Sequence, residues 1–140
     1  MLKTSLAALA ALAVAGTAAA ADLSPTDIVH RHMDFAAKGD IDSLANDYAE
    51  DAVTITNGNA TVGRAAIKAQ FAKMLGGRKG GGGGGMGAMK VIKVWQDGPV
   101  GLVSWESGPM KGTDAFVVKH GKIQSQSVFM SGGPPADPPK

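Results

Sequence analysis

The spacing of apolar residues changes once along this chain, and this change constrains the fold more than any other feature. Up to residue 75 most apolar positions recur at helical spacing, whereas four later segments alternate with a period of two: 89–96, 100–106, 113–120 and 123–130. The connectors between these four strands are short and contain Gly, which is typical of antiparallel hairpins. We therefore predict an α+β domain in which three helices cover one face of a curved antiparallel sheet.

Capping residues mark the helices of the first half. Ser24 and Asp27 match a capping box, and Pro25 suits the first position of a helix. Gly39 fits the left-handed residue that ends such a helix. The other expected elements are a second, shorter helix capped by Asp40, a strand over 50–56 that ends at the Asn57-Gly58 turn, and a third helix over 63–75.

A glycine-rich segment joins the two halves. Nine glycines lie among residues 76–87, six of them in the unbroken run Gly80–Gly85. A phosphate-binding loop needs a strand before it, a helix after it and a Lys-Ser or Lys-Thr pair at its end. Here the order of the elements is reversed and the pair is missing. We interpret the segment as a connector and predict that it is the least ordered internal part of the chain.

Both ends of the chain are expected to lie outside the domain. Residues 1–21 combine Lys3, an apolar run and small residues before Ala21, which is the pattern of a secretory signal peptide. The apolar run is too short for a typical membrane span, so we predict a secreted or periplasmic protein without membrane contact after cleavage. One domain is expected over 22–131, followed by a disordered, Pro-rich tail over 132–140.

The composition excludes several kinds of site. The chain has no cysteine, which rules out disulfides, thiol catalysis and zinc–cysteine sites. Its 14 Lys and Arg residues are scattered rather than clustered with aromatic residues, so a nucleic-acid partner is not expected. His30 and His32 are two residues apart, which is not the spacing that places two ligands on one helix face. We predict neither a metal nor a cofactor.

The strand over 113–120 indicates a sheet that is partly apolar on both faces. Asp114, Phe116 and Val118 share one side, and Ala115 and Val117 lie on the other. A sheet of this kind needs a covering on each face. The second face therefore either lines a pocket or packs against another subunit.

Three stretches of the chain resemble one known superfamily: AAKGDIDSLANDYAEDAVTI at 36–55, VGRAAIKAQF at 62–71 and GTDAFVVKHGKIQSQSVF at 112–129. They look like the nuclear transport factor 2-like superfamily, and within it the SnoaL-like domains, which are related to ketosteroid isomerases and polyketide cyclases. The resemblance runs from about residue 24 to residue 130. It implies a cystatin-like cone in which a strongly bent sheet wraps around the first helix and encloses a pocket. It also implies a homodimer.

The resemblance transfers one catalytic position of three. Ketosteroid isomerases carry a tyrosine where this chain has His32, and a proton-abstracting aspartate where it has Thr56. Their protonated aspartate, two residues before a phenylalanine, corresponds to Asp114 with Phe116. Because only Asp114 is retained, steroid isomerase activity by the known mechanism is not expected.

We predict that Asp114 and His32 form an acid–base couple in a pocket for a small hydrophobic molecule. The expected pocket walls are Tyr48, Thr56, Trp95, Trp105 and Phe116. The function predicted is small-molecule binding, with a possible isomerase- or cyclase-type proton transfer. The alternative from the same residues is a non-catalytic binding or dimerisation module, with Asp114 bonded to a neighbouring loop and His32 and the aromatic rings packed in the core.

Overall fold

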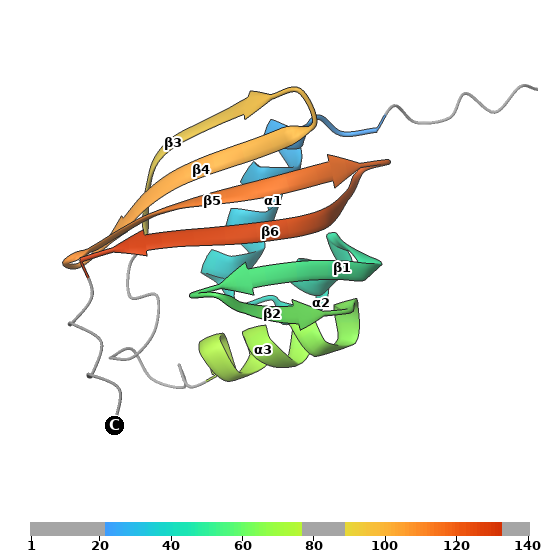
Figure 1. Cartoon of the computed structure of the whole chain (residues 1–140), viewed down its shortest axis with the longest axis horizontal. Helices are drawn as coiled ribbons and strands as arrows, with labels where there is room; N and C mark the ends of the chain where they lie inside the picture. Colours follow the sequence, from blue (N-terminus) through green and yellow to red (C-terminus); the bar gives the residue numbers. More distant parts are fainter. Residues whose placement is uncertain (1–21, 77–88, 133–140) are drawn as a thin grey trace, which may run out of the picture.

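The described part of the chain consists of three helices and six strands (Figure 1). The structure is a computed structural model that describes residues 22–76 and 89–132. The elements are α1 (Pro25–Lys38), α2 (Ile41–Asn46), β1 (Tyr48–Thr56), β2 (Asn59–Val62), α3 (Arg64–Gly76), β3 (Lys90–Asp97), β4 (Val100–Ser107), β5 (Met110–Lys119) and β6 (Lys122–Ser131). The predicted signal peptide, the Gly80–Gly85 run and the tail after Gly132 lie outside the described residues.

The six strands form one sheet in the order β2-β1-β6-β5-β4-β3. α1 packs against β3, β4 and β5, whereas α3 packs against β1, β2 and α2. In Figure 1, α1 and α2 lie behind the strands and α3 lies below β2, and the opposite face of the sheet is turned toward the viewer. This arrangement confirms the predicted α+β fold, with three helices on one face of a curved sheet. None of these helices has the length and apolarity needed to cross a bilayer.

Two features of the sheet differ from the sequence prediction. The alternation of apolar residues in the sequence does not reveal β2. This strand is only four residues long and follows directly on Asn57 and Gly58, which both have positive φ. The sheet is also mixed rather than wholly antiparallel, since β1 and β6 run parallel. A long connection through α3 and three further strands lets the chain return beside β1 in the same direction.

The local signals that define α1 are those expected. The side chain of Ser24 accepts a hydrogen bond from the backbone N–H of Asp27, whose carboxylate accepts one from the backbone N–H of Ser24. Gly39 ends the helix with a φ of 68°. In this left-handed conformation a residue with a Cβ is strained, which explains the glycine.

The first half of α1 lies unusually close to β4. A Cβ on Gly101 would lie 2.7 Å from Cγ2 of Val29 and 2.8 Å from the carbonyl oxygen of Pro25. Only a glycine allows the helix to approach the strand in this way. The contact sets the depth at which the next turn of α1, with His32, enters the core, where His32 is 2% exposed.

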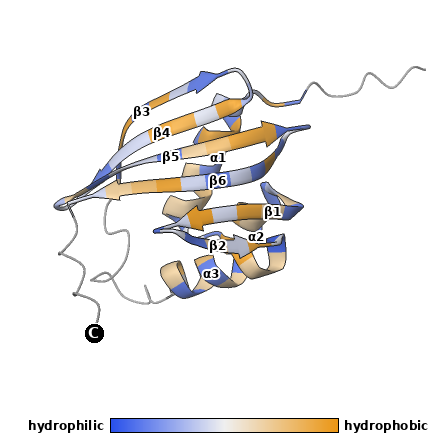
Figure 2. Cartoon of the chain, in the orientation of Figure 1, coloured by the Kyte–Doolittle hydropathy of each residue, from blue (hydrophilic) through white to orange (hydrophobic). Residues whose placement is uncertain are grey.

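The two faces of the sheet have the character predicted for β5. Asp114, Phe116 and Val118 are buried under the helices, and Val117 is exposed on the other face. This outer face also exposes Ile55 of β1 and Phe129 of β6, by 42% and 64%. Figure 2 shows these strands with hydrophobic positions among hydrophilic ones.

Candidate functional site

Polar side chains are buried in the core between the sheet and α1. His32 comes from α1, Asp47 from the end of α2, and Asp114 and Gln126 from β5 and β6, and each is at most 5% exposed. Buried polar groups cost free energy unless they find partners, so such a group of side chains is a candidate functional site.

Asp114 lies at one end of this group and is 3% exposed. Nε1 of Trp105 donates a hydrogen bond to its Oδ1 at 2.9 Å, and Nε2 of Gln126 donates one to its Oδ2 at 3.0 Å. Burial raises the pKa of Asp114, because an apolar environment disfavours the charged carboxylate, while these two hydrogen bonds act in the opposite direction. The result is a carboxyl group that is held in place and is easier to protonate than an exposed aspartate.

Gly112 makes room for the ring that binds Asp114. Gly112 is directly opposite Trp105 in the β4–β5 register. A Cβ on Gly112 would lie 2.3 Å from Cζ2 of Trp105, closer than any real contact allows. The indole therefore lies over the glycine backbone, from where its N–H reaches the carboxylate two residues further along β5.

Tyr48 connects the two halves of the polar group. Its hydroxyl donates a hydrogen bond to Oε1 of Gln126, and the same hydroxyl oxygen lies 3.4 Å from Nε2 of His32. Because the tyrosine proton points to Gln126, the hydrogen between Tyr48 and His32 must come from Nε2 of the imidazole. Burial, reinforced by the carboxylates of Asp114 and Asp47, raises the pKa of Tyr48 well above its usual range, so the phenol stays neutral.

The other nitrogen of His32 is directed at Asp47. Nδ1 lies 3.5 Å from Oδ2 of Asp47, and neither of these buried atoms has a hydrogen-bond partner among the described residues. The second carboxylate oxygen, Oδ1, accepts hydrogen bonds from Nε and Nη2 of Arg31 at 2.9 and 2.6 Å. A small approach of the two groups would bring Nδ1 and Oδ2 from the limit of hydrogen-bonding distance to a normal one.

The structure does not bring His32 and Asp114 into direct contact. Tyr48 and Gln126 stand between them, and Phe116 fills the adjoining space with its ring centroid 5.2 Å from that of His32. The predicted couple is therefore a chain of four side chains rather than a pair. Nδ1 of His32 faces Asp47 most closely.

The residues predicted to line the pocket lie in three places. Tyr48, Trp105 and Phe116 surround Asp114 in the core, each at most 2% exposed. Thr56 lies near the end of β1, opposite Val128. Trp95 lies on the outer face of the sheet, where the ammonium of Lys93 sits 5.1 Å from its ring centroid, so it is not part of this group.

Asp47, Gln126 and Arg31 are absent from the sequence prediction. Asp47 ends a short helix, a position at which an exposed aspartate is usual, and Arg31 is of a residue type found mostly on the surface. Gln126 faces the core because the β5–β6 register shifts between Val117 and Val118, which changes the phase of the alternation along β6. For Asp47, the sequence offers one signal: this residue directly precedes Tyr48, which is predicted to line the pocket.

Among the residues described, no group of three or more His, Asp or Glu side chains has the arrangement of a metal site. The core residues that the structure brings together are suited instead to hydrogen bonding and proton transfer.

The family comparison covers this whole group. The model of the SnoaL-like domain matches residues 29–126, which is more than half of the chain and includes every residue from His32 to Gln126. The chain belongs to the SnoaL-like domain family. No curated protein sequence matches the chain.

Solved structures share the fold of this SnoaL-like domain. An NTF-2 like protein of unknown function from Burkholderia xenovorans LB400 matches with a TM-score of 0.63 at 17% identity, over 79% of this chain and 85% of that one. A putative polyketide cyclase from Sinorhizobium meliloti gives 0.62 at 22% identity, over 74% and 94%. An epoxide hydrolase/cyclase-like enzyme with a role in pyran ring formation in the polyether salinomycin gives 0.61 at 19%, over 76% and 90%. At these identities the likeness establishes the fold.

Proposed function

We propose that this SnoaL-like domain binds a small apolar molecule and transfers a proton on it, with Asp114 as the acid–base group. The observation that carries the proposal is the carboxyl group of Asp114, which is 3% exposed, accepts hydrogen bonds from Trp105 and Gln126, and has a raised pKa. The proteins named above, a putative polyketide cyclase and an epoxide hydrolase/cyclase-like enzyme, support a reaction of isomerase or cyclase type.

The chemistry follows from the environment of the carboxyl group. A carboxylate whose pKa is raised is a stronger base than an exposed one, so it removes a proton from the carbon next to a carbonyl group more readily. The protonated form then returns that proton to another atom of the same molecule. The N–H groups of Trp105 and Gln126 keep both oxygens of Asp114 in place during the two steps.

The remaining polar residues position this group. Gln126 is held by the hydroxyl of Tyr48, and Tyr48 in turn lies against His32. Asp47, fixed by Arg31, faces the far side of the imidazole. His32 thus acts on Asp114 through two intermediate side chains.

Access to Asp114 requires apolar side chains to move, because Tyr48 and Phe116 occupy the adjoining space. Met89 and Met110 pack against the core, and Met110 lies four residues before Asp114 on β5. Thioether side chains adapt to a ligand at low cost because they are unbranched and flexible.

The test uses 2-tetralone, a flat and apolar ketone with exchangeable protons beside its carbonyl group. Proton NMR in D₂O follows the loss of these protons. We expect the protein to accelerate the exchange over buffer, and Asp114→Asn to lower the protein-catalysed rate by about 100-fold or more. Asp51→Asn, which removes an exposed carboxylate from β1, is the matched control and should retain the wild-type rate. A full rate in Asp114→Asn would remove Asp114 from the mechanism, and no acceleration by the wild type would contradict proton transfer on ketones of this kind.

A second candidate function is dimerisation through the outer face of the sheet. Ile55 and Val117 are exposed there by 42% and 38%, on strands that are not edges of the sheet. Apolar residues on an uncovered sheet face favour a partner surface.

The proposal further includes export, which is supported by the signal-peptide pattern of residues 1–21.

A further inference from the structure

A hollow of about 370 Å³ lies on the outer face of the sheet, away from Asp114. Its floor includes Ser104 and Thr113, neighbours on β4 and β5 that point away from the core. Ile92 and Phe129 line it as well, and they are 49% and 64% exposed. Two large apolar side chains beside two small ones leave a hollow of the size that small ligands occupy.

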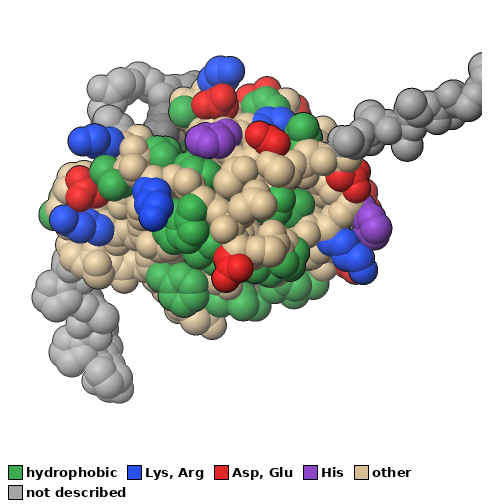
Figure 3. Space-filling view, turned by 90° about the horizontal axis from the view of Figure 1, so that it is seen from above, with side chains coloured by type: hydrophobic (Ala, Val, Ile, Leu, Met, Phe, Trp, Pro, Cys, Tyr) green, Lys and Arg blue, Asp and Glu red, His purple; other side chains and the backbone are tan. Residues whose placement is uncertain are grey.

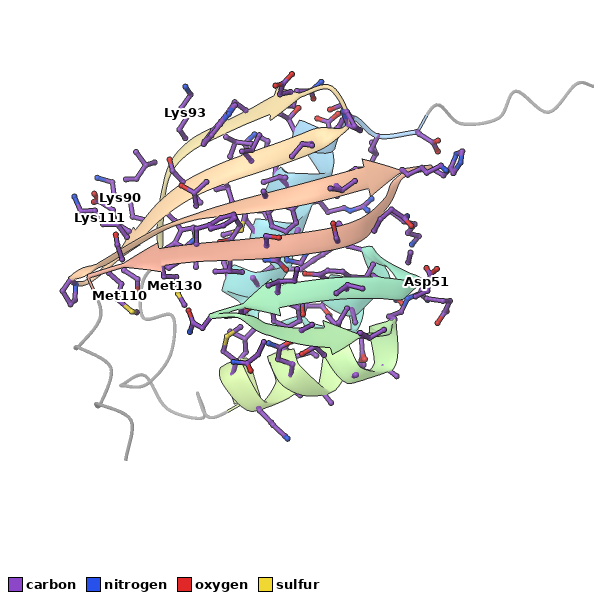
Figure 4. All side chains as sticks on the ribbon, in the orientation of Figure 1. Asp51, Lys90, Lys93, Met110, Lys111 and Met130 are labelled. Carbon is purple, nitrogen blue, oxygen red and sulfur yellow. The ribbon has the colours of Figure 1, made fainter. Side chains whose placement is uncertain are left out.

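Lysines gather at this end of the sheet. Lys90, Glu106 and Lys111 are cross-strand neighbours on β3, β4 and β5, and Lys93 is the neighbour of Ser104. Figure 4 shows Lys90, Lys93 and Lys111 projecting from the same end. In Figure 3, which views the molecule from the β3 side, Lys and Arg side chains lie beside hydrophobic ones at that end.

The single carboxylate of this set does not neutralise the lysines. Glu106 forms an ion pair of 3.2 Å with Lys111, and the two side chains are 41% and 71% exposed. Lys90 takes part in none of the ion pairs of the described residues. An exposed pair of this kind contributes little to stability, so Lys111 can exchange Glu106 for another anion at little cost.

We propose that this hollow, bounded by Ile92, Phe129 and Lys111, binds a small amphipathic anion, a molecule with one carboxylate and an apolar body. The apolar body lies between Ile92 and Phe129. The carboxylate lies at the Lys90–Lys111 end, where charge complementarity fixes its orientation, and the hydroxyls of the hollow donate further hydrogen bonds to it. Asp114 faces the opposite side of β5, and Trp105 and Gly112 lie between the two sites, since both belong to the lining of the hollow and the indole of Trp105 donates to Asp114.

The test compares octanoate with 1-octanol, which share an alkyl chain and differ in charge. Binding is followed by amide NMR shifts of the ¹⁵N-labelled protein. We expect octanoate to bind more tightly than octanol, to shift the amides of Ser104, Thr113 and Phe129, and to lose affinity as salt is added.

Variants separate the two parts of the site. Lys90→Gln combined with Lys111→Gln should weaken octanoate at least fivefold and leave octanol unchanged, whereas Phe129→Ser should weaken both. Lys119→Gln removes the same charge from the far end of β5 and should change neither, and Asp114→Asn should leave octanoate binding intact. Thermal unfolding checks that each variant is folded. If Phe129→Ser is not folded, the variant with both lysines replaced still tests the proposal.

Three results would overturn the proposal. The first is equal binding of octanoate and octanol, which would exclude a role for the lysines. The second is a set of shifts that maps to the core residues around Asp114. The third is self-association that closes the hollow, seen as octanoate binding that disappears when protein concentration favours a dimer.

Discussion

Ionisation of Asp114 works against the folded state. Its carboxyl group is easier to protonate in the folded protein than in the unfolded chain, because burial raises its pKa. The folded state therefore binds more protons than the unfolded state at pH values between the two pKa values. By linkage, the free energy of unfolding falls as the pH rises through this window and is constant above the folded pKa.

Asp114→Asn should reduce this pH dependence. Urea unfolding of the wild type, measured from pH 4 upward, should show a loss of stability that the variant shows to a smaller extent, because the amide does not ionise. Asp51→Asn is the control and should follow the wild-type profile, since the side chain at 51 is exposed. Parallel profiles for the wild type and Asp114→Asn would contradict the raised pKa.

The residues of the site differ in how far the sequence could reveal them. Asp114 and Phe116 are predictable because β5 keeps its period of two, so both fall on the buried side. Gln126 is not, because the shift in register between β5 and β6 has no clear sequence signal. The contact of His32 with Asp47 depends on how α1 packs against the segment that follows α2. Tertiary packing determines this arrangement, and the local sequence does not show it.

At the level of elements, the contact of α1 with β4 depends on the absence of a side chain at Gly101. Gly101→Ala would place a Cβ against Val29 and the backbone of Pro25 at distances below 3 Å. The helix or the strand must then shift, and we expect a loss of about 1–3 kcal/mol in the free energy of unfolding. Urea denaturation measures this loss.

Ser104→Ala on the outer side of the same strand is the control, with an expected change within about 0.5 kcal/mol. Similar stabilities for the two variants would show that α1 tolerates displacement. In that case the depth at which His32 lies would have another cause.

The elements themselves follow largely from local chemistry. The capping box and Gly39 define α1 from the sequence alone, and the Gly-containing turns define the hairpins of β3 to β6. Short turns in the sequence cannot indicate the parallel β1–β6 pair, because no turn joins these strands. The pattern of residue types likewise does not predict which side chains fill the space beside Asp114.

For the whole molecule, Ile55 and Val117, which are exposed on the outer face and do not line the hollow, predict a homodimer. We expect the wild type to sediment as a dimer and Val117→Glu to sediment as a monomer, because a charge at the centre of the interface would be buried without a partner. Lys119→Glu, on the same strand and face but near its end, should remain a dimer. A monomeric wild type would contradict this candidate function.

β6 has a position in the sheet that bears on how the chain acquires its fold. It lies between β1 and β5, so it joins the β1–β2 pair to the β3–β4–β5 unit although it is the last of the described strands. Until its residues leave the ribosome, β1 and β5 each present an unpaired edge, and the two parts of the sheet share no strand. Contacts between distant parts of a chain also form slowly. The two parts of the sheet are thus joined only once β6 is available, and a chain that stops before Lys122 leaves two half-sheets with unpaired edges rather than a smaller version of the fold.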